Sequence, residues 1–219
     1  WVQLHLVPLF DAGGRVGGFV GTATDITAER RYRRRIEDLS ALYATLSRVN
    51  SAIARCPDEQ TLCEEICRVA VERGGFAAAW IAFAEHGGVR LAGFFGSARR
   101  EIQAAVATMR LDVLPADRPT LVVRALTSGQ VQVSNDIQND PEVAPEWREG
   151  CRQSGIAAYT VVPVLCFGRI VSSIAFSSRK PGYFTAEILS LVEEIGRDFS
   201  FALENLERER QRKDTADQL

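Results

Sequence analysis

The segment "AAYTVVPVLCFGRIVSSIAFSS", residues 157–178, decides the fold of this 219-residue chain. It contains two runs rich in β-branched residues, 157–166 and 169–178, which predict two β-strands. Only Phe167 and Gly168 separate the runs, so we expect the strands to form a tight hairpin. A second pair of strands is predicted on either side of a turn at 86–88.

Helical segments surround these hairpins in the sequence. Capping residues and helix-stopping glycines predict helices at 58–73, 99–109, 118–129, 141–155 and 184–213, with one more strand at 130–136. Such a mixture of hairpins and helices is typical of an α+β fold. We therefore predict a central antiparallel sheet flanked by helices.

The first 27 residues form a separate pattern. Residues 1–10 and 15–24 alternate like two strands, and "DAGG" at 11–14 supplies the turn between them. Val2, Leu4 and Leu6 share one face of the first strand. Because a lone hairpin is marginal in water, we expect this one to end a larger sheet or to pack on another surface.

Two long helices carry apolar stripes with alternating steps of four and three residues. Such a stripe is typical of a coiled-coil seam, in which Asn50 is a polar residue that fixes the register. The sequence therefore predicts a parallel homodimer. The seam residues are Tyr32, Ile36, Leu39, Tyr43, Leu46, Asn50 and Ile53 in the first helix, and Ile188, Val192, Ile195, Phe199, Ala202 and Leu206 in the last.

Composition excludes several classes of partner. The net charge is only −2, so nothing global indicates nucleic acid or an anionic membrane, and the five arginines within 30–35 are expected to be a solvated helix face. The apolar runs are too short to cross a bilayer. Five cysteines without a secretory signal favour a reducing cytoplasm over a disulfide framework. The chain is expected to be a piece of a longer polypeptide.

Two stretches resemble known families. Residues 7–31, "VPLFDAGGRVGGFVGTATDITAERR", resemble the C-terminal hairpin of a PAS domain, whose end commonly carries "DIT" before a signalling helix. Residues 131–203 resemble the second half of a GAF domain, through Asn135-Asp136, Gly155, Val162-Pro163, the return strand from Gly168 and "FTAEI". The resemblance implies a PAS hairpin at 1–27, a signalling helix at 28–55, a GAF-like sensory domain at 40–205 and a linker at 206–219.

The resemblance also implies a function. Such domains usually sense a small molecule or a redox input and relay it through helices to an output domain, such as a diguanylate cyclase or phosphodiesterase of cyclic-di-GMP signalling, or a histidine kinase. This fragment is then expected not to be an enzyme. The alternatives are a GAF-type enzyme such as free methionine sulfoxide reductase, whose cysteine-bearing pocket loop is here replaced by "NDIQNDPEVAPEW", and a dimerisation spacer without a ligand.

A small-molecule pocket is predicted between the sheet and the helix at 142–154. Its expected lining residues are Trp80, Asn135, Asp136, Trp147, Arg148, Cys151 and Tyr159. The alternative is that the aromatic residues are core and that Asp136 caps a turn. The cysteines lack the neighbouring histidines that a metal site or a reactive thiol needs, so no metal is expected and no cofactor can be named.

Overall fold

The computed structural model describes residues 1–53, 56–111 and 120–217, without the side chains of 38, 41, 42, 45–53 and 217. The chain divides into two compact units, Trp1–Ser40 and Ala41–Leu219. Each unit is described by itself. No helix in the described residues is long and apolar enough to span a membrane.

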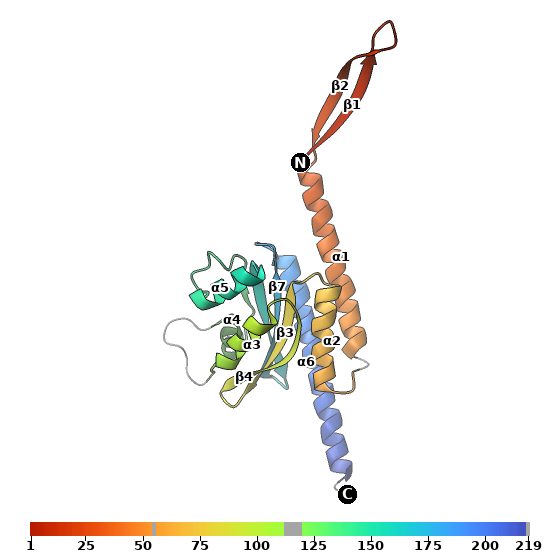
Figure 1. Cartoon of the computed structure of the whole chain (residues 1–219). Coiled ribbons are helices and arrows are strands. Elements are labelled where there is room, and N and C mark those ends of the chain that lie inside the picture. The colour runs from red at the N-terminus through yellow and green to blue at the C-terminus, as the bar shows by residue number, and fades with distance from the viewer. Residues whose placement is uncertain (54–55, 112–119, 218–219) are drawn as a thin grey trace. The chain divides into compact units, whose positions relative to one another are not determined.

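The second unit is built on a five-stranded antiparallel sheet (Figure 1). The strands lie in the order β4-β3-β7-β6-β5. The hairpin predicted from residues 157–178 is confirmed as β6 and β7, and Phe167 and Gly168 adopt the positive φ angles of 50° and 76° that a two-residue turn needs. The strands are β3 (Ala78–Glu85), β4 (Gly88–Gly96), β5 (Gln132–Ser134), β6 (Ala158–Cys166) and β7 (Arg169–Ser178).

Helices cover both faces of this sheet, so the predicted α+β fold is confirmed (Figure 1). One face carries α2 (Glu59–Glu72) and α6 (Ala186–Asp217). The other carries α3 (Arg99–Thr108), α4 (Leu121–Ser128) and α5 (Pro145–Ser154). Thr120 caps α4 through the Val123 amide, and α5 begins with proline and ends at left-handed Gly155, as the sequence pattern indicates.

The apolar stripe of α6 belongs to the core of its own domain. Its residues Ile188, Val192, Ile195, Phe199 and Ala202 are all buried. The prediction that these side chains form a dimer seam is therefore wrong. A helix that packs on its own sheet shows the same spacing as a helix that packs on a twin, so the period alone could not separate the two cases. Leu206, which ends the stripe, is half-buried.

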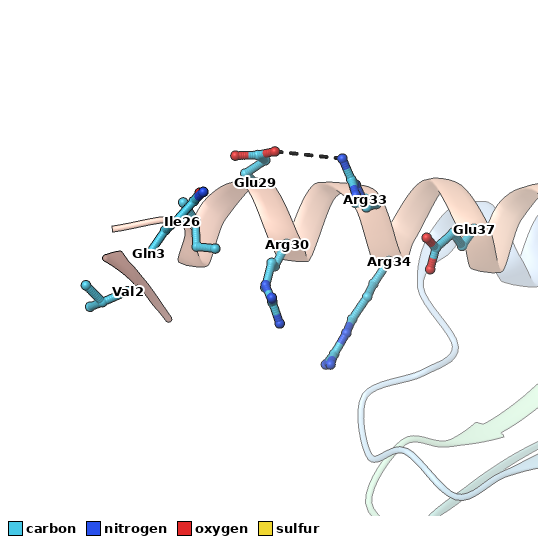
Figure 2. A pocket seen from close by; sticks show the side chains of 8 residues that line it. All are labelled: Val2, Gln3, Ile26, Glu29, Arg30, Arg33, Arg34 and Glu37. Atoms are coloured by element: carbon cyan, nitrogen blue, oxygen red, sulfur yellow. Dashed lines mark ion pairs between the residues drawn. The ribbon is translucent and has the colours of Figure 1, made fainter. Parts of the chain in front are cut away.

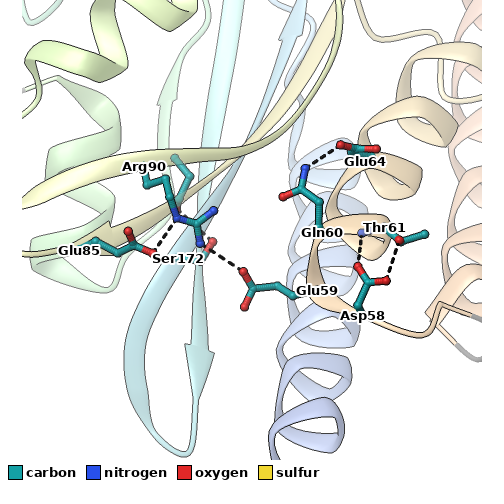
Figure 3. A network of polar contacts seen from close by, with 9 residues as sticks. Asp58, Glu59, Gln60, Thr61, Glu64, Glu85, Arg90 and Ser172 are labelled. Carbon is teal, nitrogen blue, oxygen red and sulfur yellow. Dashed lines mark hydrogen bonds and ion pairs between the residues drawn. The ribbon is translucent and has the colours of Figure 1, made fainter. Parts of the chain in front are cut away.

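Close packing places α2 on β3 and β4. A Cβ atom added at Gly93 in β4 would lie 2.6 Å from the Cys63 carbonyl oxygen, so only glycine allows this approach. Figure 3 shows the polar contacts at the start of the same helix. Arg90 donates to Glu85 at 2.7 Å and to Glu59 at 3.2 Å, while Asp58 caps α2 by accepting from the Thr61 amide at 2.8 Å.

The first unit consists of the hairpin β1 (Val2–Phe10) and β2 (Val16–Asp25), followed by the first half of α1 (Thr27–Ile53). Apolar side chains on both strands are exposed within this unit, among them Leu4, Leu6 and Phe19. The amide of Thr27 donates to Asp25 at 2.9 Å and starts the helix. Figure 2 shows Glu29 paired with Arg33 along α1, with Arg30 and Arg34 directed to another side.

The stripe on α1 has a different environment from the stripe on α6. Tyr32, Ile36 and Tyr43 are each at least 60% exposed, and Leu39 is half-buried. The side chains of Leu46, Asn50 and Ile53 lie outside the described part of the structure. Three of the four seam residues whose side chains are described are thus exposed to solvent.

We predict that Gly93→Ala destabilises the domain by about 1–3 kcal/mol, because the new methyl group meets the backbone of Cys63. Gly150→Ala is the matched control. Its Cβ would lie 3.8 Å from the Glu101 Cβ, an ordinary contact, and alanine in a helix should add about 0.5–1 kcal/mol. Urea unfolding measures both changes. Equal stability of the two variants would contradict the close approach of α2 to β4.

Candidate functional site

Three aromatic side chains meet on the sheet face that α3, α4 and α5 cover. The ring centroids of Trp80 and Tyr159 lie 6.4 Å apart, those of Trp147 and Tyr159 lie 5.9 Å apart, and those of Trp80 and Trp147 lie 6.4 Å apart. Trp80 lies in β3, Trp147 in α5 and Tyr159 in β6. Trp80 is therefore at least 67 residues from either partner in the sequence. We call them the aromatic cluster. The structure brings the three rings into contact, as both the predicted pocket and the alternative of core aromatic residues require, so the pocket itself stays a prediction.

Strand register explains why the rings reach one another. Trp80 stands opposite Ala175 on β7, and Ala175 stands opposite Val161 on β6. Side chains of opposed residues lie on the same face of a sheet, so the small Ala175 leaves room beside Trp80 that the larger rings fill. Trp80 and Tyr159 are each only 2% exposed.

Two polar atoms at this face are buried without a partner in the described chain. Trp80 Nε1 and Ser134 Oγ have no hydrogen-bond partner among the described residues, whereas the Trp147 side chain hydrogen-bonds to Tyr159 and partly offsets the rise in the Tyr159 pKa. Ser134 stands directly opposite Tyr159 in the β5–β6 pair, so its side chain lies on the same face as the cluster. A buried donor without an acceptor costs about 1–3 kcal/mol. Each of these two groups carries that cost unless a partner outside the described residues satisfies it.

Burial also shapes the titration of two groups at the site. It raises the pKa of the Cys151 thiol to about 12. It likewise raises the pKa of the Tyr159 hydroxyl, and the Cys151 charge acts in the same direction. Both groups are therefore neutral at physiological pH, and the surroundings disfavour negative charge.

The other predicted lining residues hold the structure around the cluster. Asn135 donates from Nδ2 to the Phe184 carbonyl at 3.0 Å and accepts from the Phe184 amide at 2.9 Å. Asp136 is exposed and accepts from Asn139 at 2.8 Å, as a turn residue would. Arg148 turns its Nε to the Val143 carbonyl at 2.9 Å. The prediction missed Ser134, since a lone serine in a short strand gives no signal before its neighbours are known.

Two surface grooves are built differently from this site. One lies at the base of the β1–β2 hairpin and is lined by exposed side chains such as Arg30, Arg34 and Glu37 (Figure 2). The other, of about 760 Å³, lies between the start of α2 and the end of α6, next to the Arg90 contacts of Figure 3. Among the described residues, no group of three His, Cys, Asp or Glu side chains is placed to hold a metal ion.

A sequence profile of the GAF domain matches residues 56–204, which is more than half of the chain. This chain belongs to the GAF domain family. The match includes the sheet, the helices on both its faces and every residue of the aromatic cluster. A comparison with curated proteins finds no match.

Solved structures share the fold at low sequence identity. Free methionine-R-sulfoxide reductase from Neisseria meningitidis, solved with its substrate, is 17% identical with a TM-score of 0.62, covering 78% of this chain and 93% of its own. The GAF domain region of a Geobacter sulfurreducens PCA protein is 21% identical with a TM-score of 0.53, covering 66% and 92%. A domain of a protein named as a two-component sensor histidine kinase from Sinorhizobium meliloti 1021 is 18% identical with a TM-score of 0.51, covering 67% and 91%.

These structures correct one prediction from the sequence. The chain was expected not to be an enzyme, yet free methionine-R-sulfoxide reductases are among the proteins that share its fold. The sequence lacks the cysteine-bearing pocket loop of the free methionine sulfoxide reductases, but that difference alone is not sufficient to exclude an enzyme. The GAF fold alone is compatible with both sensing and catalysis.

We predict that Cys151 resists alkylation by iodoacetamide at pH 8, because the thiolate is the reacting form and its pKa is about 12. Cys56 and Cys166, which are only half-buried, should react before it. Mass spectrometry after timed labelling measures the order, and in urea all five cysteines should react alike. Modification of Cys151 as fast as Cys166 in the folded protein would contradict this environment.

The same pKa shift predicts how stability depends on pH. The folded-state pKa lies above the ordinary value of 9, so the folded state keeps a proton that the unfolded state loses. The contribution of Cys151 to the free energy of unfolding is thus fully present below about pH 9 and falls between about pH 9 and 12. Urea unfolding of Cys151→Ser should show a smaller fall across that window than the parent protein.

Proposed function

We propose that this chain is the sensory GAF domain of a signal-transduction protein, and that a small molecule binds at the aromatic cluster. The observation that carries the proposal is the set of buried polar atoms without partners, Trp80 Nε1 above all. Stable domains rarely leave such groups unpaired, and a bound molecule can supply the missing acceptor. The GAF domains among the structural relatives agree with a sensory function.

Hydrogen bonds connect Asn135, which follows β5, and the end of β6 to α6 and to the residue before it. Asn135 follows Ser134 directly and ties Phe184, just before α6, to the sheet. At the far end of β6, the Leu165 amide donates to Ser200 at 3.1 Å and the Phe167 amide donates to Glu204 at 2.9 Å. The Arg208 guanidinium lies 5.2 Å from the Phe167 ring centroid and pairs with Glu204 at 3.2 Å. A shift of β6 at Tyr159 would therefore act on both the start and the later turns of α6.

A thermal-shift screen of cell metabolites tests ligand binding. A ligand bound only by the folded state stabilises it by about 2.7 kcal/mol at 100 times its Kd, which raises the melting temperature. We predict that at least one compound does so and that Trp80→Phe weakens the effect, whereas Trp1→Phe, at an exposed position, leaves it unchanged. A shift that is equal in both variants would place the ligand elsewhere.

The relay has a separate test. We predict that the ligand from the screen slows backbone hydrogen exchange in residues 199–208, and that Glu204→Ala abolishes this protection while binding persists. Glu209→Ala, an exposed change on the same helix, serves as the control and should preserve the protection. Protection that survives in Glu204→Ala would show that the contact at the β6–β7 turn carries no signal.

Methionine sulfoxide reduction is the second candidate function. It is favoured by the similarity to the Neisseria meningitidis reductase, and burial of the Cys151 thiol, which keeps it protonated, counts against that cysteine as the nucleophile. A turnover assay with free methionine-R-sulfoxide and a thiol reductant tests it. Activity that Cys151→Ser or Cys166→Ser abolishes would establish an enzyme, and activity that both variants retain would point to a contaminant.

We further propose that α1 forms a homodimer through its uncovered stripe. Tyr32, Ile36 and Tyr43 lie at the spacing of a coiled-coil seam and are exposed in the single chain. The output domain, if it follows the architecture that the sequence resembles, would then receive the signal from paired helices. The proposal does not involve the buried stripe of α6.

We predict that Ile36→Glu shifts the chain toward monomer, because it places a carboxylate at the centre of the seam. Arg34→Glu introduces the same side chain at a position opposite the seam and should leave the dimer intact. Light scattering after gel filtration, across a range of protein concentrations, measures the mass. A parent chain that is monomeric at high concentration would contradict the dimer.

A further inference from the structure

The outer edge of β4 lacks a partner strand along most of its described length. β4 lies at one end of the strand order, so only its inner edge pairs with β3. On the outer edge, among the described residues, one isolated bridge joins Gly88 to Arg110. An unpaired edge presents main-chain N–H and C=O groups that another extended chain can bind. The edge beyond Gly88 is therefore a surface for strand addition.

The register shows which main-chain groups of β4 face outward. The Ser97 amide donates to the Ala77 carbonyl at 3.0 Å, and in an antiparallel pair every second residue bonds the same neighbour. Phe95 therefore bonds β3, and Phe94 directs its N–H and C=O to the outer edge. The Phe94 carbonyl accepts from Arg99 Nη2 at 3.3 Å, which agrees with this direction. A side-chain donor thus occupies the place that a neighbouring strand would fill with a main-chain N–H.

A groove of about 530 Å³ lies along this edge. β4 contributes residues 91–95 to its floor, α2 forms one wall and α3 the other. Because α2 and α3 cover opposite faces of the sheet, a strand placed in the groove would direct alternate side chains to the two walls. The layout therefore suits an extended peptide, in which successive side chains point to opposite sides.

The α2 wall of the groove is acidic. Arg68 lies between Glu65 and Glu72 and pairs with each at 2.6 Å, so one positive charge faces two negative charges. Glu64 is exposed and accepts from the neutral side chain of Gln60 at 2.6 Å (Figure 3). The excess of carboxylates on this wall is complementary to basic side chains.

The α3 wall of the groove is basic. The Arg99 guanidinium lies 4.8 Å from the centroid of the Phe94 ring and donates to the Phe94 carbonyl. The other α3 residue that lines the groove is the neutral Gln103. A main-chain N–H of an incoming strand would replace the guanidinium at that carbonyl and release Arg99 to pair with a carboxylate of the same strand. This wall is therefore complementary to acidic side chains.

We propose that the β4 edge binds an extended segment of a partner protein, in which basic residues facing α2 alternate with acidic residues facing α3. The segment pairs antiparallel to β4, as all neighbouring strands of this sheet do. Phe94 packs in the core that α3 covers, and residues opposite each other in a strand pair share one face. The acidic residues therefore donate their N–H groups to β4, whereas the N–H groups of the basic residues point away from it.

An octapeptide of alternating lysine and glutamate tests this proposal when it is titrated with the full chain and followed by fluorescence anisotropy. A block isomer, with all lysines before all glutamates, has the same composition and controls for charge alone. Two further versions carry N-methyl groups on every glutamate or on every lysine. N-methylation removes the main-chain N–H and keeps the side chain, so these versions report which N–H groups bind the protein.

We expect the alternating peptide and its N-methyl-lysine version to bind about tenfold more tightly than the block isomer and the N-methyl-glutamate version, which cannot form the main-chain bonds in register. Glu64→Lys should weaken binding of the alternating peptide about threefold or more, because it reverses a charge on the α2 wall. Glu209→Lys makes the same change at an exposed position on α6 and should leave the affinity unchanged.

Equal affinities of the two N-methylated versions would show that no strand pairs with β4, and would overturn the proposal. Absence of binding by every peptide would overturn it as well. A second copy of the chain is the competing occupant of this edge. In that case the peptide affinity would fall as the protein concentration rises, and Glu64→Lys would lower the mass measured by light scattering, so the proposed partner class would be wrong.

Discussion

The five-stranded sheet must be covered on both faces, and the structure meets this constraint in two different ways. On one face, α2 and α6 contribute apolar side chains that pack directly on the strands, closely enough that Gly93 admits no Cβ. On the other, α3, α4 and α5 cover a surface that includes two indoles, a tyrosine and a serine. Polar groups placed there need partners, and Trp80 Nε1 and Ser134 Oγ find none among the described residues.

Under the proposed function, this difference separates a face that stabilises the domain from a face that binds the ligand. The α2–α6 face uses its apolar side chains for stability, so the stripe of α6 has nothing left for a second molecule. The opposite face carries a cost that evolution commonly accepts only where a site is needed. Because Asn135 binds Phe184 just before α6 and the Phe167 amide binds Glu204 on α6, the proposed relay would run from the cluster through these contacts.

Local patterns were sufficient to predict much of the fold. The strands at 157–178 could be predicted because β-branched residues flank a two-residue turn. The same segment supplies β6 and β7, which are interior strands of the sheet. Trp80, Trp147 and Tyr159 could be grouped because the family resemblance aligned their elements. The contact that Asn135 makes could not be predicted from the sequence. Its partner, Phe184, lies 49 residues away, and Asn135 binds the backbone of Phe184 and not its side chain. The α6 stripe was misread because periodicity specifies a buried face and not the surface that buries it.

The central claim is that the Trp80 indole takes its acceptor from outside the chain. A high-resolution crystal structure of the full chain, grown with the compound selected by screening, tests this most directly. The account predicts an oxygen or nitrogen atom of that compound within hydrogen-bond distance of Trp80 Nε1. A structure in which Trp80 Nε1 instead donates to a group of the protein itself, with the compound bound elsewhere, would contradict it.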